Sequence, residues 1–246
     1  EFNPEIIGFS AIVSNSYKYV KKLSLIIKKN FPKTFMILGG QLSYAANVVL
    51  EHTPINVVVI GEGENTVISL CEYLAGNIKL KDVRGIAFKD NNGEIIFTEQ
   101  VCQVSKIDSL SFPNYELIDM KSYLVTGKER FGGFNIEDPR FYEEHRKGKK
   151  AFTIMTGRGC QAKCTFCCRG VRGLRKHSPE FILDNMELLI KNYNVGFFTF
   201  GDESFVSSKK WVMSFIEKLN ERKLDIMFYI LGARVDIVDR ELLTAL

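Results

Sequence analysis

The sequence has no long hydrophobic run and no large excess of charge of either sign. Within its 246 residues no apolar stretch approaches the roughly 18 residues of a membrane span, and the chain does not open with a charged segment followed by an apolar one. We therefore expect a cytoplasmic protein with no membrane span. The formal net charge of +4, from 33 basic and 29 acidic residues, does not indicate a nucleic-acid partner. With 46% hydrophobic residues, the chain can bury a core and form one or two domains.

Three short apolar runs near the start of the chain predict strands. They occupy residues 6–9, 35–38 and 57–60. Because none of them alternates with polar residues, we expect each strand to be buried on both faces, as in a parallel sheet. Apolar residues at positions 20, 23 and 27 predict an amphipathic crossover helix, and a second helix is expected at 66–74. The pattern predicts an α/β domain over residues 1–80.

The middle of the chain has weaker periodicity. Residues 85–88 and 94–98 predict two strands of a small antiparallel hairpin, joined by a turn at Asn92-Gly93. From residue 109 to 150, scattered Pro and Gly with mixed charge predict an interdomain connector. We therefore assign 81–150 to the hairpin and connector.

The α/β alternation restarts in residues 151–246. Strands are expected at 152–155, 196–200 and 226–231, with helices between them. Ser178 and Pro179 predict the start of the first helix, as its N-cap and first helical residue. We expect two apolar stripes to pack in the core: Ile182, Met186, Leu189 and Ile190, then Trp211, Val212, Phe215, Ile216 and Leu219.

Three cysteines lie within eight residues: Cys160, Cys164 and Cys167. Three thiolates on one loop can bind three irons of a 4Fe-4S cluster and leave the fourth iron open for chemistry. A structural zinc site is the alternative, but it needs four ligands, and no second pair of Cys or His follows. Only His177 or the adjacent Cys168 could complete it, and we predict that Cys168 binds no metal. Disulfides are disfavoured in a chain of this size without a secretion leader.

The spacing C-x3-C-x2-C, with Phe166 directly before the third cysteine, resembles the motif of the radical S-adenosylmethionine (radical SAM) superfamily. The resemblance implies that S-adenosylmethionine chelates the open iron through its amino and carboxylate groups. One electron from the cluster then yields a 5′-deoxyadenosyl radical. The resemblance to this superfamily also implies a partial (β/α) barrel, of which residues 151–246 would be the first half. The chain opens within five residues of a predicted strand and stops at Leu246 inside a predicted helix, so we expect an excerpt of a longer protein.

Two further groups are candidates for binding S-adenosylmethionine. Gly201-Asp202-Glu203 follows the strand at 196–200, at the end where parallel α/β folds place ligands. It is similar to a superfamily motif that contacts the amino group, although an ordinary turn into a helix would look the same. Arg234 follows the third strand and could pair with the carboxylate, or form a surface ion pair instead.

Three strand ends of the first domain resemble those of the cobalamin-binding domain found before many radical SAM domains. They carry Ser10, Gly39 and Gly40, then Gly61, Glu62, Gly63 and Glu64. Glycines let a ligand approach the backbone, and the serine hydroxyl and acidic side chains offer polar contacts. Each alone could be an ordinary βα turn. The fold class predicted for the whole chain is therefore a partial doubly wound, Rossmann-like domain followed by half of a partial barrel.

The family often supplies a cobalt-binding histidine from Asp-x-His-x-x-Gly, and this motif is missing. The nearest match, around His145, lies in the connector, and we interpret it as coincidence. Three explanations for the missing motif stay open: the first two strands of the domain were lost with the N-terminus, cobalamin binds without a histidine ligand, or the domain is a vestigial scaffold. His52 and His177 are interpreted as polar surface or capping groups.

The resemblance predicts a radical SAM enzyme with a 4Fe-4S cluster, S-adenosylmethionine and cobalamin as cofactors. The reaction that we expect first for such an enzyme is methyl transfer to an unactivated carbon of a small, natural-product-like substrate. A flavodoxin or ferredoxin would supply electrons. Cyclisation or rearrangement without methyl transfer is one alternative. A non-catalytic iron-sulfur electron carrier is another, although carriers usually bind every iron through protein cysteines.

Overall fold

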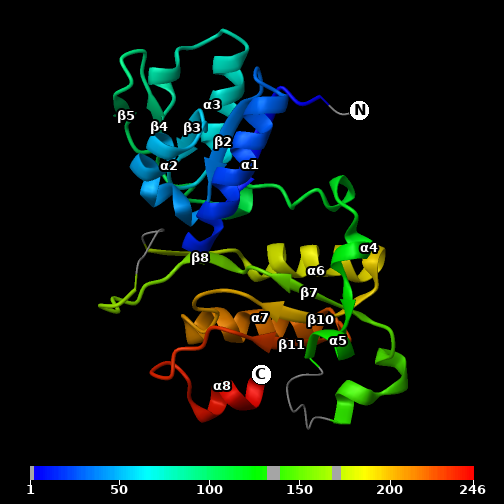
Figure 1. Cartoon of the computed structure of the whole chain (residues 1–246). Coiled ribbons are helices and arrows are strands. Elements are labelled where there is room, and N and C mark those ends of the chain that lie inside the picture. Colours follow the sequence, from blue (N-terminus) through cyan, green and yellow to red (C-terminus); the bar gives the residue numbers. More distant parts are fainter. Residues whose placement is uncertain (1–2, 132–138, 168–172) are drawn as a thin grey trace. The chain divides into compact units, whose positions relative to one another are not determined.

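A computed structural model of the chain describes residues 3–131, 139–167 and 173–246 (Figure 1). The chain forms two compact units, residues 1–104 and residues 105–246. Across the described residues, no helix combines the length and the apolar character needed to cross a membrane.

The first unit is built on a five-stranded sheet in the order β1-β2-β3-β4-β5. The strands are β1 (Ile6–Ser10), β2 (Phe35–Gly39), β3 (Val57–Val59), β4 (Ile86–Lys89) and β5 (Ile95–Phe97). The first three are parallel, whereas β4 and β5 run antiparallel to their neighbours. The carboxyl ends of β1, β2 and β3 therefore meet at one edge of the sheet.

Helices cover both faces of this sheet, as the predicted doubly wound class requires. The helices are α1 (Tyr17–Asn30), α2 (Ala46–His52) and α3 (Glu64–Leu74). α1 and α2 pack in one apolar cluster, and α3 packs through Leu70 in the cluster on the other face. β2 and β3 are buried as predicted, but the prediction for β1 was wrong. β1 pairs only with β2 among the described strands, so its side chains alternate between exposed and half-buried.

The predicted hairpin exists, but it is more than an appendage. In its turn the Asp90 carboxylate accepts hydrogen bonds from the backbone N–H of Asn92 and Glu94, both at 2.9 Å, and Gly93 takes a φ of +83°. β4 also pairs with β3, which makes the hairpin part of the main sheet. The predicted boundary at residue 80 thus falls inside the first unit, which extends to residue 104.

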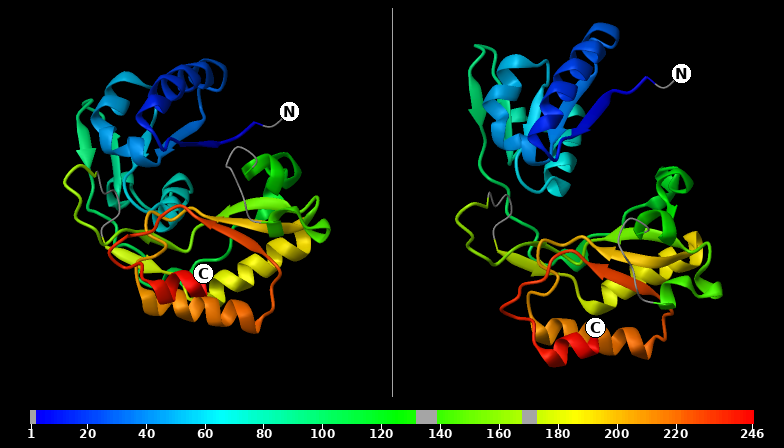
Figure 2. Two further views of the ribbon diagram at one scale, coloured as in Figure 1. Left: turned by 90° about the horizontal axis from the view of Figure 1, so that it is seen from below. Right: turned by 60° about the horizontal axis from the view of Figure 1, so that its bottom comes forward.

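The second unit, coloured green to red in Figure 2, has a four-stranded sheet in the order β11-β10-β7-β6. The strands are β6 (Val125–Thr126), β7 (Lys150–Ile154), β10 (Val195–Phe200) and β11 (Met227–Ile230). β7, β10 and β11 are parallel, as predicted, and β6 is antiparallel to β7. α6 (Pro179–Tyr193) and α7 (Lys209–Glu221) connect the parallel strands and share one apolar core. The predicted stripes pack there, with Trp211 and Ile190 partly buried at its margin.

Local capping chemistry fixes where the helices of this unit begin. The Ser178 hydroxyl accepts a hydrogen bond from the Phe181 N–H at 3.2 Å, and Pro179 opens α6, as predicted. Asp239 caps α8 (Arg240–Ala245) through the Leu242 N–H at 2.9 Å. Such caps satisfy N–H groups that have no partner within the helix.

The predicted connector packs as part of the second unit. It contains α4 (Met120–Tyr123) and α5 (Gly127–Phe131) besides short 3-10 turns. Tyr115, Met120 and Leu124 lie in the main core of this unit. The Tyr115 hydroxyl donates a hydrogen bond to the Asn185 side-chain oxygen at 3.2 Å, which ties the segment to α6.

Candidate functional site

The cysteine loop lies at the tip of a short β-hairpin. β8 (Gly157–Gly159) and β9 (Leu174–Lys176) are antiparallel, and all three motif cysteines fall between them. A Cβ on Gly157 would lie 2.7 Å from the Arg175 carbonyl oxygen, so glycine permits this close pairing. The sequence did not reveal these strands, because Gly157–Gly159 and Leu174–Lys176 contain no apolar run.

The thiols on this loop are accessible. Cys164 and Cys167 are exposed, Cys160 is half-buried, and all three are free. The Ala162 N–H lies 3.4 Å from the Cys160 Sγ, and Phe166 is 90% exposed. In the portion of the chain that the structure covers, no three His, Cys, Asp or Glu side chains form a ready-made metal site. The ligand set Cys160, Cys164 and Cys167 stays a prediction, and Cys168 lies outside the described residues.

The two acids after β10 have opposite environments. Asp202 is 5% exposed, and its carboxylate accepts hydrogen bonds from the Thr156 N–H at 2.9 and 3.0 Å and from the Thr156 hydroxyl at 2.7 Å. Glu203 is exposed. Gly201 lets this turn approach β7, since a Cβ there would lie 2.9 Å from the Thr153 Cγ2. Of the predicted pair, Glu203 is the acid available to a ligand.

Lys176, at the end of β9, extends the Asp202–Thr156 contact. Its Nζ donates to the Thr156 hydroxyl at 2.6 Å and lies 4.3 Å from the ring centre of Trp211 and 5.0 Å from that of Phe205. Burial lowers the pKa of Lys176 to about 8, and the nearby Asp202 carboxylate opposes the shift. The ammonium group is held between an aromatic wall and a hydroxyl.

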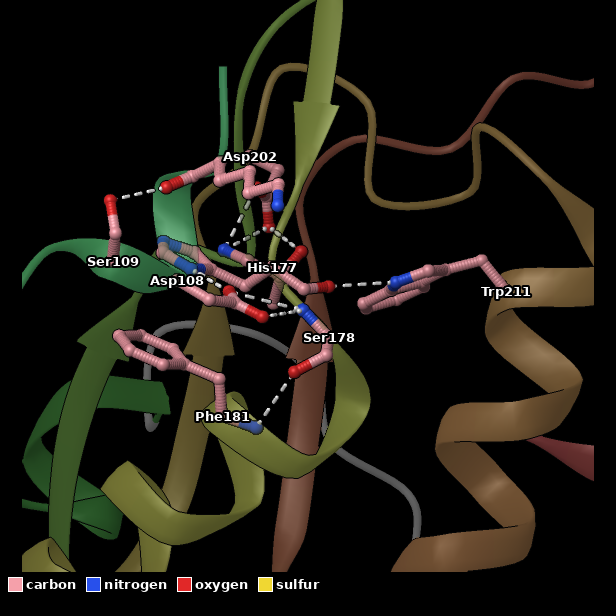
Figure 3. A network of polar contacts seen from close by, with 9 residues as sticks. Asp108, Ser109, His177, Ser178, Phe181, Asp202 and Trp211 are labelled. Atoms are coloured by element: carbon pink, nitrogen blue, oxygen red, sulfur yellow. Dashed lines mark hydrogen bonds and ion pairs between the residues drawn. The ribbon is translucent and has the colours of Figure 1, made fainter. Parts of the chain in front are cut away.

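His177, which we interpreted as a polar surface or capping group, is half-buried. Its ring stacks on Phe181 at 4.3 Å, and its Nδ1 lies 2.7 Å from a carboxylate oxygen of Asp108 (Figure 3). Burial lowers the pKa of His177 and outweighs the opposing effect of Asp108. Because an ionised carboxylate can only accept, Nδ1 is the donor in this contact. Burial would raise the pKa of Asp108, but hydrogen bonds from Ser178 and His177 outweigh it and lower the pKa.

A cavity of about 480 Å³ opens beside the root of the hairpin. Its polar lining includes Arg158, His177 and Glu203. Its apolar lining includes Phe112, Phe152 and Phe181. Sequence reasoning missed this cavity, because residues from the connector, β7, α6 and the β10 loop combine only in the folded unit.

Arg234 lies after β11, in the loop that packs against the Asp202 turn. A Cβ on Gly232 would lie 2.4 Å from the Asp202 carbonyl oxygen, so this approach requires glycine. The Arg234 guanidinium pairs with Asp236 through Nε at 3.0 Å and Nη2 at 2.6 Å. Asp236 raises the pKa of Arg234. Arg234 thus forms the ion pair that we considered as its alternative role, and a role toward a ligand stays a prediction.

In the first unit, five of the seven predicted cobalamin-binding residues line one cavity of about 370 Å³: Ser10, Gly39, Gly40, Gly61 and Gly63. A Cβ on Gly39 would meet no atom within 4 Å, so this backbone is open to the cavity. Gly40 has a different role. It takes a φ of +85°, and a Cβ there would lie 2.6 Å from the Ala11 carbonyl oxygen. Gly40 thus lets β1 and β2 approach each other.

The two predicted acids of this region do not line the cavity. Glu62 accepts a hydrogen bond from the Val104 N–H at 2.9 Å, and Glu64 begins α3. No histidine is among the described lining residues. His145 lies in the second unit, 2.9 Å from Asp225, and His52 is exposed on α2.

Comparison with known proteins locates relatives of both units. Residues 1–70 match the family described as B12 binding domain. The uncharacterized methyltransferase PH0819 of Pyrococcus horikoshii is 27% identical over 233 residues, 92% of this chain and 45% of that protein. The anaerobic magnesium-protoporphyrin IX monomethyl ester cyclase of Cereibacter sphaeroides is 29% identical over 249 residues, 98% of this chain and 37% of that protein.

A solved structure shares the fold of nearly the whole chain. OxsB, described as a cobalamin-dependent S-adenosylmethionine radical enzyme and solved with aqua-cobalamin bound, aligns with a TM-score of 0.72 at 23% identity. The alignment covers 99% of this chain and 33% of OxsB. The chain spans less than half the length of the two curated relatives above. The predicted α/β fold class is confirmed, whereas the partial barrel stays a prediction.

Proposed function

We propose that this chain is part of a cobalamin-dependent radical SAM enzyme, as the sequence predicts and the matches support. One observation carries the proposal most directly. A loop with three free cysteines follows the parallel strand β7 in the chain, downstream of a unit whose first 70 residues match a B12 binding domain.

The residues of the second unit suit a cluster and its co-substrate. Cys160, Cys164 and Cys167 would hold a 4Fe-4S cluster, because they offer three accessible thiols and the loop offers no fourth partner among the described residues. Such a cluster supplies the electron that cleaves S-adenosylmethionine to a 5′-deoxyadenosyl radical. Glu203 would accept hydrogen bonds from the amino group of S-adenosylmethionine, and Arg234 would pair with the carboxylate of S-adenosylmethionine.

The residues of the first unit suit part of a cobalamin. The glycine-lined cavity offers open backbone at Gly39 and Gly61 and the hydroxyl of Ser10. Cobalamin supplies a methyl group that can be transferred to a carbon radical. Methyl transfer is therefore the reaction that we favour, and the similarity to a methyltransferase supports it. The similarity to a cyclase favours ring formation as the second candidate.

We also propose a substrate class, an electron donor and a cellular compartment for this enzyme. The substrate is a small, natural-product-like molecule, and a flavodoxin or ferredoxin supplies electrons. The enzyme works in the cytoplasm, where thiols stay reduced.

The product assay tests the proposal. Full-length protein, reconstituted anaerobically with iron and sulfide, is incubated with dithionite and S-adenosylmethionine. We expect 5′-deoxyadenosine from the wild type and none from Cys164→Ala. Formation of S-adenosylhomocysteine as a second product, when substrate is present, identifies methyl transfer. Conversion of substrate without S-adenosylhomocysteine identifies cyclisation. A protein that is reduced by dithionite but forms no 5′-deoxyadenosine is an electron carrier.

A further inference from the structure

The carboxylate of Asp202 is already fully engaged by the protein. It is buried and accepts two backbone contacts and one hydroxyl contact, all from Thr156. A buried carboxylate with such partners gains little by exchanging them for a ligand, because any lost hydrogen bond leaves a charged oxygen without compensation. The neighbouring Glu203 is exposed and lines the cavity.

The partner of Asp202 occupies the root of the cysteine hairpin. Thr156 directly precedes β8, and its carbonyl oxygen accepts a hydrogen bond from the His177 N–H at 2.9 Å, directly after β9. The Thr156 hydroxyl also accepts from Lys176 at 2.6 Å, and Lys176 is the register partner of Gly157. One threonine therefore contacts both strands of the hairpin and the turn after β10.

Aromatic side chains fix the other side of this contact. The Lys176 ammonium lies against Phe205 and Trp211. The Trp211 Nε1 donates to the His177 carbonyl oxygen at 2.9 Å (Figure 3). Phe205 follows the turn after β10 and Trp211 lies in the first turn of α7, so the hairpin root is held from the same segment that carries Glu203.

We propose that Asp202 is a positioning residue, which fastens the cysteine hairpin to the end of β10 through Thr156 and so sets the position of Glu203 relative to the three cysteines. In the Gly-Asp-Glu run, Glu203 is then the acid that meets S-adenosylmethionine. This role for the site rests on the proposed function, but the fastening itself does not.

Hydrogen exchange of the full-length protein without cluster tests the fastening. Asp202→Asn and Thr156→Val each remove hydrogen bonds of the network, so amides of residues 156–159 and 174–177 should exchange about tenfold faster than in the wild type. Thr156→Ser keeps the hydroxyl and should exchange like the wild type, as should Glu203→Gln. The double variant Asp202→Asn/Thr156→Val should show less acceleration than the sum of the two single variants, because the contact between the Thr156 hydroxyl and Asp202 is common to both.

The same variants separate positioning from ligand contact after anaerobic reconstitution. Glu203→Gln should weaken S-adenosylmethionine binding about tenfold and leave the electron paramagnetic resonance (EPR) spectrum of the reduced cluster without S-adenosylmethionine unchanged. Asp202→Asn and Thr156→Val should change that spectrum, and Thr156→Ser should restore it.

Two results overturn the inference. One is unchanged hairpin exchange in both Asp202→Asn and Thr156→Val. The other is an Asp202→Asn protein that matches Glu203→Gln in every measurement while Thr156→Val behaves like the wild type. A wild type that assembles no cluster would refute the proposed function, and the exchange result would still decide the fastening.

Discussion

Adjacent residues in this chain have different roles because the fold turns them in different directions. Asp202 is buried and Glu203 is exposed, although both follow the same strand. Gly39 opens to a cavity, whereas Gly40 allows contact between two strand ends. A sequence motif therefore identifies a candidate functional segment, and the structure shows which of its side chains are exposed and which are buried.

The pKa of Lys176 predicts a pH-dependent contribution to stability. Its pKa is about 8 in the folded chain, below the roughly 10.4 expected in the unfolded chain, so the unfolded chain binds more protons between these values. Stability contributed by this group should rise from pH 8 to 10. Relative to Lys176→Arg, which stays charged, the wild type should gain stability over this range in chemical denaturation. A difference that is flat with pH would contradict the prediction.

Gly39, the last residue of β2, and Gly40, which follows it, offer a matched pair of variants. Gly40→Ala should destabilise the chain by about 1–3 kcal/mol, because its φ is positive and its Cβ would press on Ala11. Gly39→Ala should cost less, since its Cβ meets no atom within 4 Å, yet it should weaken cobalamin binding by narrowing the cavity. Chemical denaturation and an absorbance titration with aqua-cobalamin measure the two effects. Equal losses of stability would contradict the assignment.

At the scale of elements, features that depend on neighbouring residues were predicted from the sequence, whereas features that depend on pairing between distant residues were not. Ser178 and Pro179 indicated the start of α6, since a cap needs only neighbouring residues. The strands β8 and β9 were missed, because their pairing joins residues on either side of the cysteine loop. The cavity was missed for the same reason, since its His177 and Phe112 lie far apart in sequence.

The cap of α6 gives a prediction at this scale. Ser178→Ala removes the hydroxyl that accepts from the Phe181 N–H and should destabilise the chain by about 1 kcal/mol. Ser178→Asp can accept the same hydrogen bond, but its charge adjoins Asp108, so Ser178→Asn is the better control and should retain most of the stability. Thermal unfolding measures the change. If both variants lose the same stability, the cap contributes little.

At the scale of the whole chain, the sequence predicted the α/β class and two groups of parallel strands, but it did not show which unit the hairpin and the connector join. The apolar runs of β2, β3 and β10 are long enough to mark buried strands. The hairpin joined the first sheet because β4 pairs with β3, and the connector joined the second core through Tyr115. Neither pairing leaves a trace in local composition.

The central claim is that three cysteines hold a cluster with one iron open to S-adenosylmethionine. EPR of the dithionite-reduced, full-length protein, recorded with and without S-adenosylmethionine, tests it most directly. We predict a 4Fe-4S signal that shifts when S-adenosylmethionine is added and is lost in Cys160→Ala. A 4Fe-4S signal that S-adenosylmethionine leaves unchanged, or a protein that contains zinc in place of iron, would contradict the account.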